Sequence, residues 1–184
     1  MKKIILHFAF CIFALIFVAC HTPRGNDTSA KESIVAADTL IAATGNAELD
    51  SLLQAAAVAR PDTTLALLYY EIAEKYKDND VEQSKAYFLK LEKLSEELDW
   101  NKGRYSFFMG FSLILSRERL GDSALAVCQK ALEIAQLERN DVWIANANIS
   151  IGNSFLSKQW NQTALQYYTE ALSIFERTNN TEGI

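Results

Sequence analysis

Roughly the last two-thirds of the chain repeats its own pattern at an interval of about 40 residues, and this constrains the fold more than any other feature. Ala124 and Leu125 are matched one interval later by Ala164 and Leu165. The same pattern, with one residue fewer in the loop, is found one interval earlier, over about 64–100. Such a period is typical of helical-repeat proteins, in which each unit buries its apolar face only against its neighbours.

The last unit shows what is being repeated. Residues 142–157 carry an apolar stripe at steps of three and four residues: Ile144, Ala147, Ile151 and Phe155. The segment 158–161 breaks this pattern, and a second stripe follows with Ala164, Tyr168, Ala171, Leu172 and Phe175. Two stripes of helical period joined by a short polar break predict an antiparallel helix pair. We expect three such pairs, over about 64–100, 101–140 and 141–178.

The first helix of each pair resembles that of the tetratricopeptide repeat (TPR) family, which has aromatic, large apolar, small and aromatic residues at steps of three, one and three. The first unit fits all four positions with Tyr69, Ile72, Ala73 and Tyr76. The second fits in kind with Phe108, Phe111, Ser112 and Leu115. The third fits with Ile151, Gly152 and Phe155, while Asn148 stands where the aromatic is expected. The resemblance implies an all-α, right-handed α-solenoid. The interval exceeds the family's usual length of about 34 residues, which predicts longer helices, and an ordinary helical bundle is the alternative.

The resemblance also implies a binding surface, the concave face lined by the first helices. Transferred by register, its residues are Tyr70, Glu74, Lys77, Met109, Leu113, Ser116, Arg117, Asn146, Ile149, Asn153 and Ser157. Amide and apolar side chains together suit an extended peptide or a helix. The basic clamp that some family members use for a terminal carboxylate is absent, because Arg117 has no matching partners. The alternative at each position is a residue that merely faces solvent.

The amino terminus predicts export. Lys2 and Lys3 precede an apolar run over 4–19, the arrangement of a secretory signal. The run ends in Phe-Val-Ala followed by Cys20, which resembles the lipobox of bacterial lipoproteins. We therefore expect a signal peptide over 1–19, lipidation of Cys20, a flexible tether over 20–45 and attachment to a membrane in the cell envelope, on the periplasmic side or at the outer membrane. A cleaved signal without lipid and a retained anchor are the alternatives.

The helical domain is expected over 46–184 and to begin with a single cap helix, 47–60. Pro61 ends that helix and Asp62 caps the next one. Between the helices of the second pair, Gly121 is expected to permit the turn, with Asp122 or Ser123 as the amino-terminal cap.

Composition argues against catalysis. The chain has two histidines, His7 in the apolar run and His21 in the tether, and no glycine-rich phosphate loop, so we expect a non-enzymatic protein without metal or cofactor. Loss of Lys2 and Lys3 leaves 16 basic against 23 acidic residues, a net charge of −7. This charge disfavours nucleic acid as a partner. Cys128, on the apolar face of a predicted helix, is expected to be a packing residue.

No polar capping helix follows the last pair. We therefore expect the natural chain to continue past Ile184, or the open edge, assigned to Ala171, Ile174 and Phe175, to support self-association. The functional hypothesis is an exported scaffold that binds a protein or peptide. The alternative is the extracytoplasmic sensor region of a signalling protein, whose histidine kinase or transcriptional regulator lies beyond residue 184.

Overall fold

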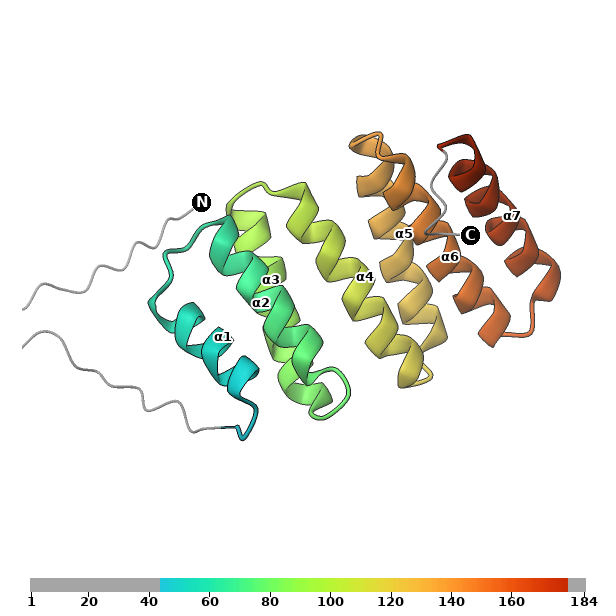
Figure 1. The fold of residues 1–184 in the computed structure, drawn as a ribbon. Coiled ribbons are helices and arrows are strands. Elements are labelled where there is room, and N and C mark those ends of the chain that lie inside the picture. Colours follow the sequence, from blue (N-terminus) through green and yellow to red (C-terminus); the bar gives the residue numbers. More distant parts are fainter. Residues whose placement is uncertain (1–43, 179–184) are drawn as a thin grey trace, which may run out of the picture. The chain divides into compact units, whose positions relative to one another are not determined.

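The computed structural model describes residues 44–178, which form seven α-helices and no strand (Figure 1). This part of the chain is therefore all-α, as predicted. The helices are α1 (Ala47–Val58), α2 (Thr63–Tyr76), α3 (Val81–Glu97), α4 (Asn101–Arg117), α5 (Gly121–Leu137), α6 (Asp141–Ser157) and α7 (Asn161–Arg177). The predicted signal peptide, Cys20, most of the tether and the segment 179–184 lie outside the described residues. Between 44 and 178, no helix is both long and apolar enough to cross a membrane.

Helix length explains the interval of the repeat. Each helix from α3 to α7 has 17 residues, and a turn of constant length separates it from the next. Two such helices with their two turns therefore fill one interval, and the expectation of longer helices is confirmed. The predicted bounds 47–60 and 142–157 differ from those of α1 and α6 by one or two positions.

Four helices begin with a side chain that accepts hydrogen bonds from their first backbone N–H groups. These caps are Asn46, Asp62, Asp80 and Asn140. The predicted role of Asp62 is thus confirmed. The prediction for α5 is wrong: its N-cap is Leu120, which forms no side-chain cap, and Asp122 pairs instead with Lys158.

The four turns after α3, α4, α5 and α6 share one conformation. The second residue of each has a positive φ: Asp99, Arg119, Arg139 and Gln159. After α3, the N–H of Trp100 donates to the carbonyl of Ser95 at 2.8 Å, and the N–H of Asp99 donates to Glu96 at 3.1 Å. This pair of bonds is the Schellman motif, which usually places glycine at the left-handed position. Gly121 was expected to permit the turn before α5, but Arg119 adopts the left-handed conformation and Gly121 opens the helix.

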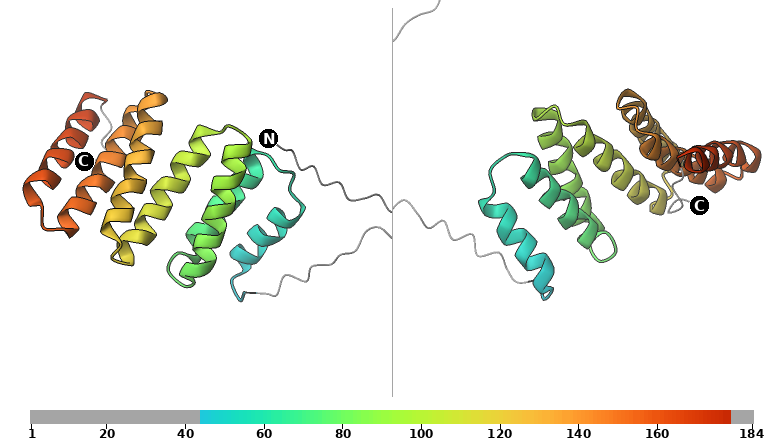
Figure 2. Two further views of the ribbon diagram at one scale, coloured as in Figure 1. Left: turned by 180° about the vertical axis from the view of Figure 1, so that it is seen from behind. Right: turned by 45° about the horizontal axis from the view of Figure 1, so that its top comes forward.

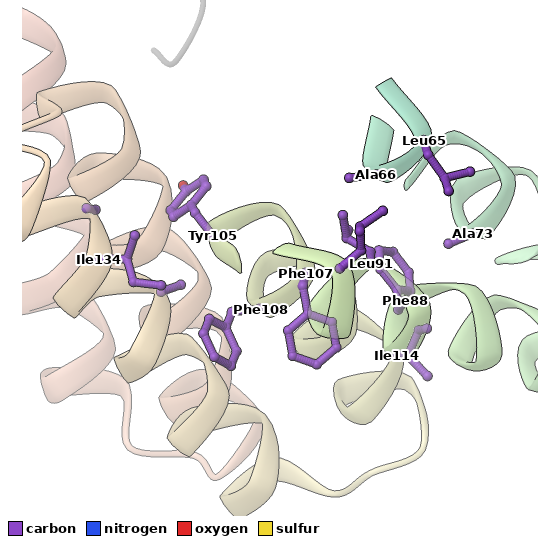
Figure 3. Packing of buried hydrophobic residues seen from close by; sticks show 13 residues of the cluster. Leu65, Ala66, Ala73, Phe88, Leu91, Tyr105, Phe107, Phe108, Ile114 and Ile134 are labelled. Atoms are coloured by element: carbon purple, nitrogen blue, oxygen red, sulfur yellow. The ribbon is translucent and has the colours of Figure 1, made fainter. Parts of the chain in front are cut away.

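Each helix packs against the helices before and after it, and α4 also contacts α2 and α6 (Figure 2). The alternation of buried and exposed residues along α3 is the same as that along α5, position by position. The largest core cluster joins α2, α3, α4 and α5, and Figure 3 shows Phe88 and Leu91 of α3 beside Ile114 of α4. Cys128 is buried, as predicted. The repeat in sequence is therefore also a repeat in packing.

Gly152 and Gly110 both permit close contact between helices. A Cβ at Gly152, the small position of the third unit, would lie 2.6 Å from the ring of Tyr168, so α6 and α7 approach closely there. A Cβ at Gly110 would lie 2.2 Å from the ring of Phe88, a contact that the sequence analysis did not identify.

The carboxyl-terminal edge differs from its prediction. Ala171, Ile174 and Phe175 are buried in a cluster with Ala145 of α6 and do not form an exposed edge. They occupy the positions of Ala131, Ile134 and Ala135 in α5, which are buried as well. The exposed large apolar residues of α7 are Leu165 and Leu172.

Candidate functional site

The candidate surface is carried by three helices that are neighbours in space although they are separated along the chain. Its predicted residues come from α2, α4 and α6, and α4 contacts both of the others. Every one of these residues is at least partly exposed. We refer to the surface formed by these side chains as the α2/α4/α6 face.

On α2, the predicted residues interact with one another and with the core. The ammonium group of Lys77 pairs with the carboxylate of Glu74 one turn earlier. The ring of Tyr70 packs edge-on against Phe88, with centroids 6.2 Å apart. Burial raises the pKa of Tyr70, and the neighbouring Glu74 carboxylate raises it further. Tyr70 is therefore a neutral hydroxyl near pH 7, available as a donor or an acceptor.

Arg117 ties the end of α4 to the end of α2. Its guanidinium lies 2.6 Å from the carboxylate of Asp78 and 3.3 Å from the carbonyl oxygen of Lys77. These contacts hold Arg117 between two repeats. Its basic neighbour on the face, Lys77, is itself paired with Glu74.

The centre of the face is apolar. Met109 is partly buried against the main core cluster, and Leu113, one turn further along α4, leaves 42% of its surface exposed. Ser116 follows, and its hydroxyl donates to the carbonyl oxygen of Ser112 at 2.9 Å within the helix. Leu113 thus presents an exposed apolar side chain between Met109 and Ser116.

The α6 part of the face is more polar and partly committed to internal contacts. The Asn153 side-chain oxygen accepts a hydrogen bond from the Tyr168 hydroxyl at 2.7 Å. Its amide N–H groups remain for a partner, so Asn153 offers less than the sequence analysis assumed. Asn146 and Ile149 are half-buried, and the hydroxyl of Ser157 donates to the carbonyl oxygen of Ser154.

A hollow of about 510 Å³ extends the face at the ends of α4 and α6. It is lined by Ser116, Arg119, Gly121, Asp122, Ser157 and Lys158. Sequence reasoning placed both serines on the face, but it missed the three charged residues. These residues lie in turns or at the start of a helix, and the register of the first helices does not predict side chains at such positions. The hollow brings a paired Lys158 and Asp122 beside Arg119, which forms no ion pair with residues 44–178.

Little in the described region suggests covalent chemistry. Residues 44–178 contain no group of three metal-ligating side chains. Burial raises the pKa of the Cys128 thiol, although the hydroxyls of Ser112 and Ser154 lower it in part. A buried, protonated thiol is a poor nucleophile. The face is chemically suited to non-covalent contacts: hydroxyl and amide groups around one exposed leucine.

Comparison with protein-family models, with curated proteins and with solved structures returns no match for this chain. The family resemblance therefore rests on the residues and the repeat themselves.

Proposed function

We propose that residues 46–184 form a TPR-like, right-handed α-solenoid of antiparallel helix pairs that binds a peptide or protein and catalyses no reaction. The equal lengths of α3 to α7, the evenly spaced turns and the matching burial patterns of α3 and α5 support a repeated pair. The contacts of α4 with α2 and α6 support a stack in which the first helices of successive pairs are neighbours.

The observation that carries the binding function is the exposure of Leu113 at the centre of the α2/α4/α6 face. Half-buried Tyr70 on α2 and Asn146 and Ile149 on α6 lie on the flanking helices. An apolar anchor surrounded by groups that donate and accept hydrogen bonds is the arrangement used to bind a peptide backbone and one of its side chains. The partner is accordingly a peptide segment with an apolar anchor residue.

We further propose that this scaffold is held at a membrane, on the basis of the apolar run over 4–19 and Cys20. In this proposal Cys20 carries lipid, residues 20–45 act as tether, and the helical domain meets its partner in the cell envelope. After loss of the presequence the net charge is −7. This negative charge favours a protein over a nucleic acid as the partner.

The binding proposal is tested by comparing two leucine variants in affinity capture from envelope extract. Leu113→Glu places a charge on the face, while Leu137→Glu places one on α5, where Leu137 is 71% exposed. A partner captured by the unmutated chain should be retained by Leu137→Glu and lost, by about tenfold or more, with Leu113→Glu, because burying an unpaired carboxylate is strongly unfavourable. Equal capture by the two variants would move the site away from this face.

A further inference from the structure

The buried apolar core of residues 44–178 divides between α5 and α6. The buried members of the largest cluster come from α2, α3, α4 and α5. A separate cluster belongs to α6 and α7: Ala145, Ala171, Ile174 and Phe175. From α6, the largest cluster is contacted by Trp143 and Ile144, which both lie in the first turn of that helix. The apolar core is therefore continuous across the α5–α6 interface only near the start of α6.

The α5–α6 interface repeats the α3–α4 interface with smaller or more polar side chains. In the α3–α4 interface, the ring of Phe88 lies against Gly110 of α4. Phe107 and Ile114 lie on the same side of α4, at helical steps of three and four from Gly110. One interval later, the positions of Phe88, Phe107 and Ile114 hold three residues that are buried as well: Cys128, Ala147 and Ser154. Because stabilisation grows with the apolar area buried, the α5–α6 interface is held less strongly than the α3–α4 interface.

One end of the α5–α6 interface is firmly held. The ring of Tyr105, near the start of α4, stacks on Trp143 of α6 with centroids 4.4 Å apart and planes 7° apart. The Tyr105 hydroxyl also donates to the carbonyl oxygen of Trp143 at 3.1 Å. At the same end, the Asn101 amide donates to the carboxylate of Glu138, in the turn between α5 and α6, at 2.7 Å. This turn and its contacts fix the start of α6 to α4 and α5.

The other end of the interface is loosely held. The hollow of about 510 Å³ lies here, lined by residues from the end of α4, the start of α5 and the end of α6. Lys158 and Asp122 form an ion pair between α6 and α5, but the side chain of Asp122 is 94% exposed. Exposed ion pairs of this kind contribute little to stability. The hollow and the ion pair therefore oppose a separation of the two helices only weakly.

Helices α6 and α7 are tied to each other along their length. The ring of Tyr168 lies against Gly152, where a Cβ would be 2.6 Å away. The Tyr168 hydroxyl donates to the side-chain oxygen of Asn153 at 2.7 Å. Nearer the end of α7, Ile174 is buried in one cluster with Ala145 of α6. These contacts keep α6 and α7 together when other contacts of α6 break.

We propose that α6 and α7 open together from α4 and α5, by rotation about the turn 138–140, while α2 to α5 stay folded. The Cys128 thiol interacts with the hydroxyls of Ser112 of α4 and Ser154 of α6, so the closed interface covers it. Fraying of α7 alone leaves this thiol covered, because α7 packs against α6 and not against α5. The opening parts the α2/α4/α6 face between Leu113 and Ile149, so it bears on the proposed function without resting on it.

Alkylation of thiols in the full chain tests the opening. The rate at which iodoacetamide labels Cys128, found by mass spectrometry of its peptide, is divided into the rate for the urea-unfolded chain to give a protection factor. The matched control is Ser95→Cys with Cys128→Ser, since Ser95 is fully buried against Gly103 in the α3–α4 interface. Protection should be about tenfold or more lower at Cys128 than at position 95, because a local opening costs less than global unfolding. Equal protection at the two positions would overturn the proposal.

A lock across the loose end provides a second test that leaves the α3–α4 interface unchanged. A Cβ at Gly121 would lie 3.6 Å from the Ser157 hydroxyl, so Gly121→Cys with Ser157→Cys can form a disulfide between α5 and α6. In the oxidised double variant, labelling of Cys128 should be slower than in the unmutated chain by about tenfold or more, because the lock leaves global unfolding as the route of exposure. An unchanged labelling rate in the locked chain would overturn the proposal.

Discussion

At the scale of single residues, Gly110 permits a close contact between α3 and α4. The aromatic ring of Phe88 fills the space that a side chain at 110 would need, and this ring is fully buried. Gly110→Ala should therefore lower the free energy of unfolding by about 1–3 kcal/mol, although alanine by itself favours a helix by about 1 kcal/mol. Gly121→Ala is the control, since its nearest neighbours lie 3.6 Å away. Urea denaturation of both variants decides the point, and a Gly110→Ala variant as stable as the control would contradict the packing.

Cys128 makes a prediction about pH. Burial raises the pKa of its thiol above the value of about 8.5 expected in the unfolded chain. Above that pH the unfolded state loses the proton first, so stability is complete below pH 8.5 and falls as the pH rises, by at most about 1.4 kcal/mol per pH unit. Denaturation at pH 7.5 and 9.5 should show a larger loss for the unmutated chain than for Cys128→Ala. Burial is the main cause of the raised pKa of Tyr105 and acts in both proteins, with the neighbouring Cys128 as a smaller cause. Equal losses of stability in the two proteins would indicate that the Cys128 thiol lies at the surface and ionises there.

At the scale of elements, the turns contain backbone strain that a glycine substitution would remove. Arg139 has φ of +52° between α5 and α6, in a conformation that costs about 1–2 kcal/mol for a residue with a Cβ. Arg139→Gly removes this cost but adds about 0.4–1 kcal/mol of unfolded-state entropy, so we expect a net gain of up to about 1 kcal/mol. Arg139→Ala keeps the Cβ and should show no gain. Thermal melts compare the two, and an alanine variant at least as stable as the glycine variant would rule out strain at this position.

The helices themselves could be predicted because their apolar residues recur at helical period and their packing repeats. The turns could not. Four non-glycine residues adopt the left-handed conformation, because the flanking helices fix the backbone there more strongly than local preference does. Leu120 begins α5 without a side-chain cap for the same reason, and this left Asp122 free to pair with Lys158.

The candidate surface was predictable in its location but less so in its chemistry. Register alone assigned residues to α2, α4 and α6, and the contacts between these helices bring them together. Register did not show that Asn153 is held by Tyr168 or that Arg117 is held by Asp78, because both contacts join different elements. It also assigned the open edge of α7 to Ala171, which α6 buries, whereas the exposed apolar residues of α7 are Leu165 and Leu172.

At the scale of the whole molecule, we propose that Cys20 joins the helical scaffold to a membrane. Cys20→Ser should release the protein from the membrane fraction or leave the precursor unprocessed, because stable attachment depends on the acyl chains. Fractionation of cells measures this. Metabolic labelling with a fatty acid provides the second readout: incorporation into the unmutated chain is expected and should vanish in the variant. An unmutated chain that incorporates no label would reject the lipid anchor.

The central claim is that the α2/α4/α6 face, and not the opposite surface of the scaffold, meets the partner. Site-specific photo-cross-linking in whole cells tests it most directly, with a benzoylphenylalanine residue at Leu113 on the face or at Leu137 on α5, both exposed positions. We expect an adduct with a second protein from position 113 and none from position 137. An adduct from 137 alone, or from neither position, would contradict it.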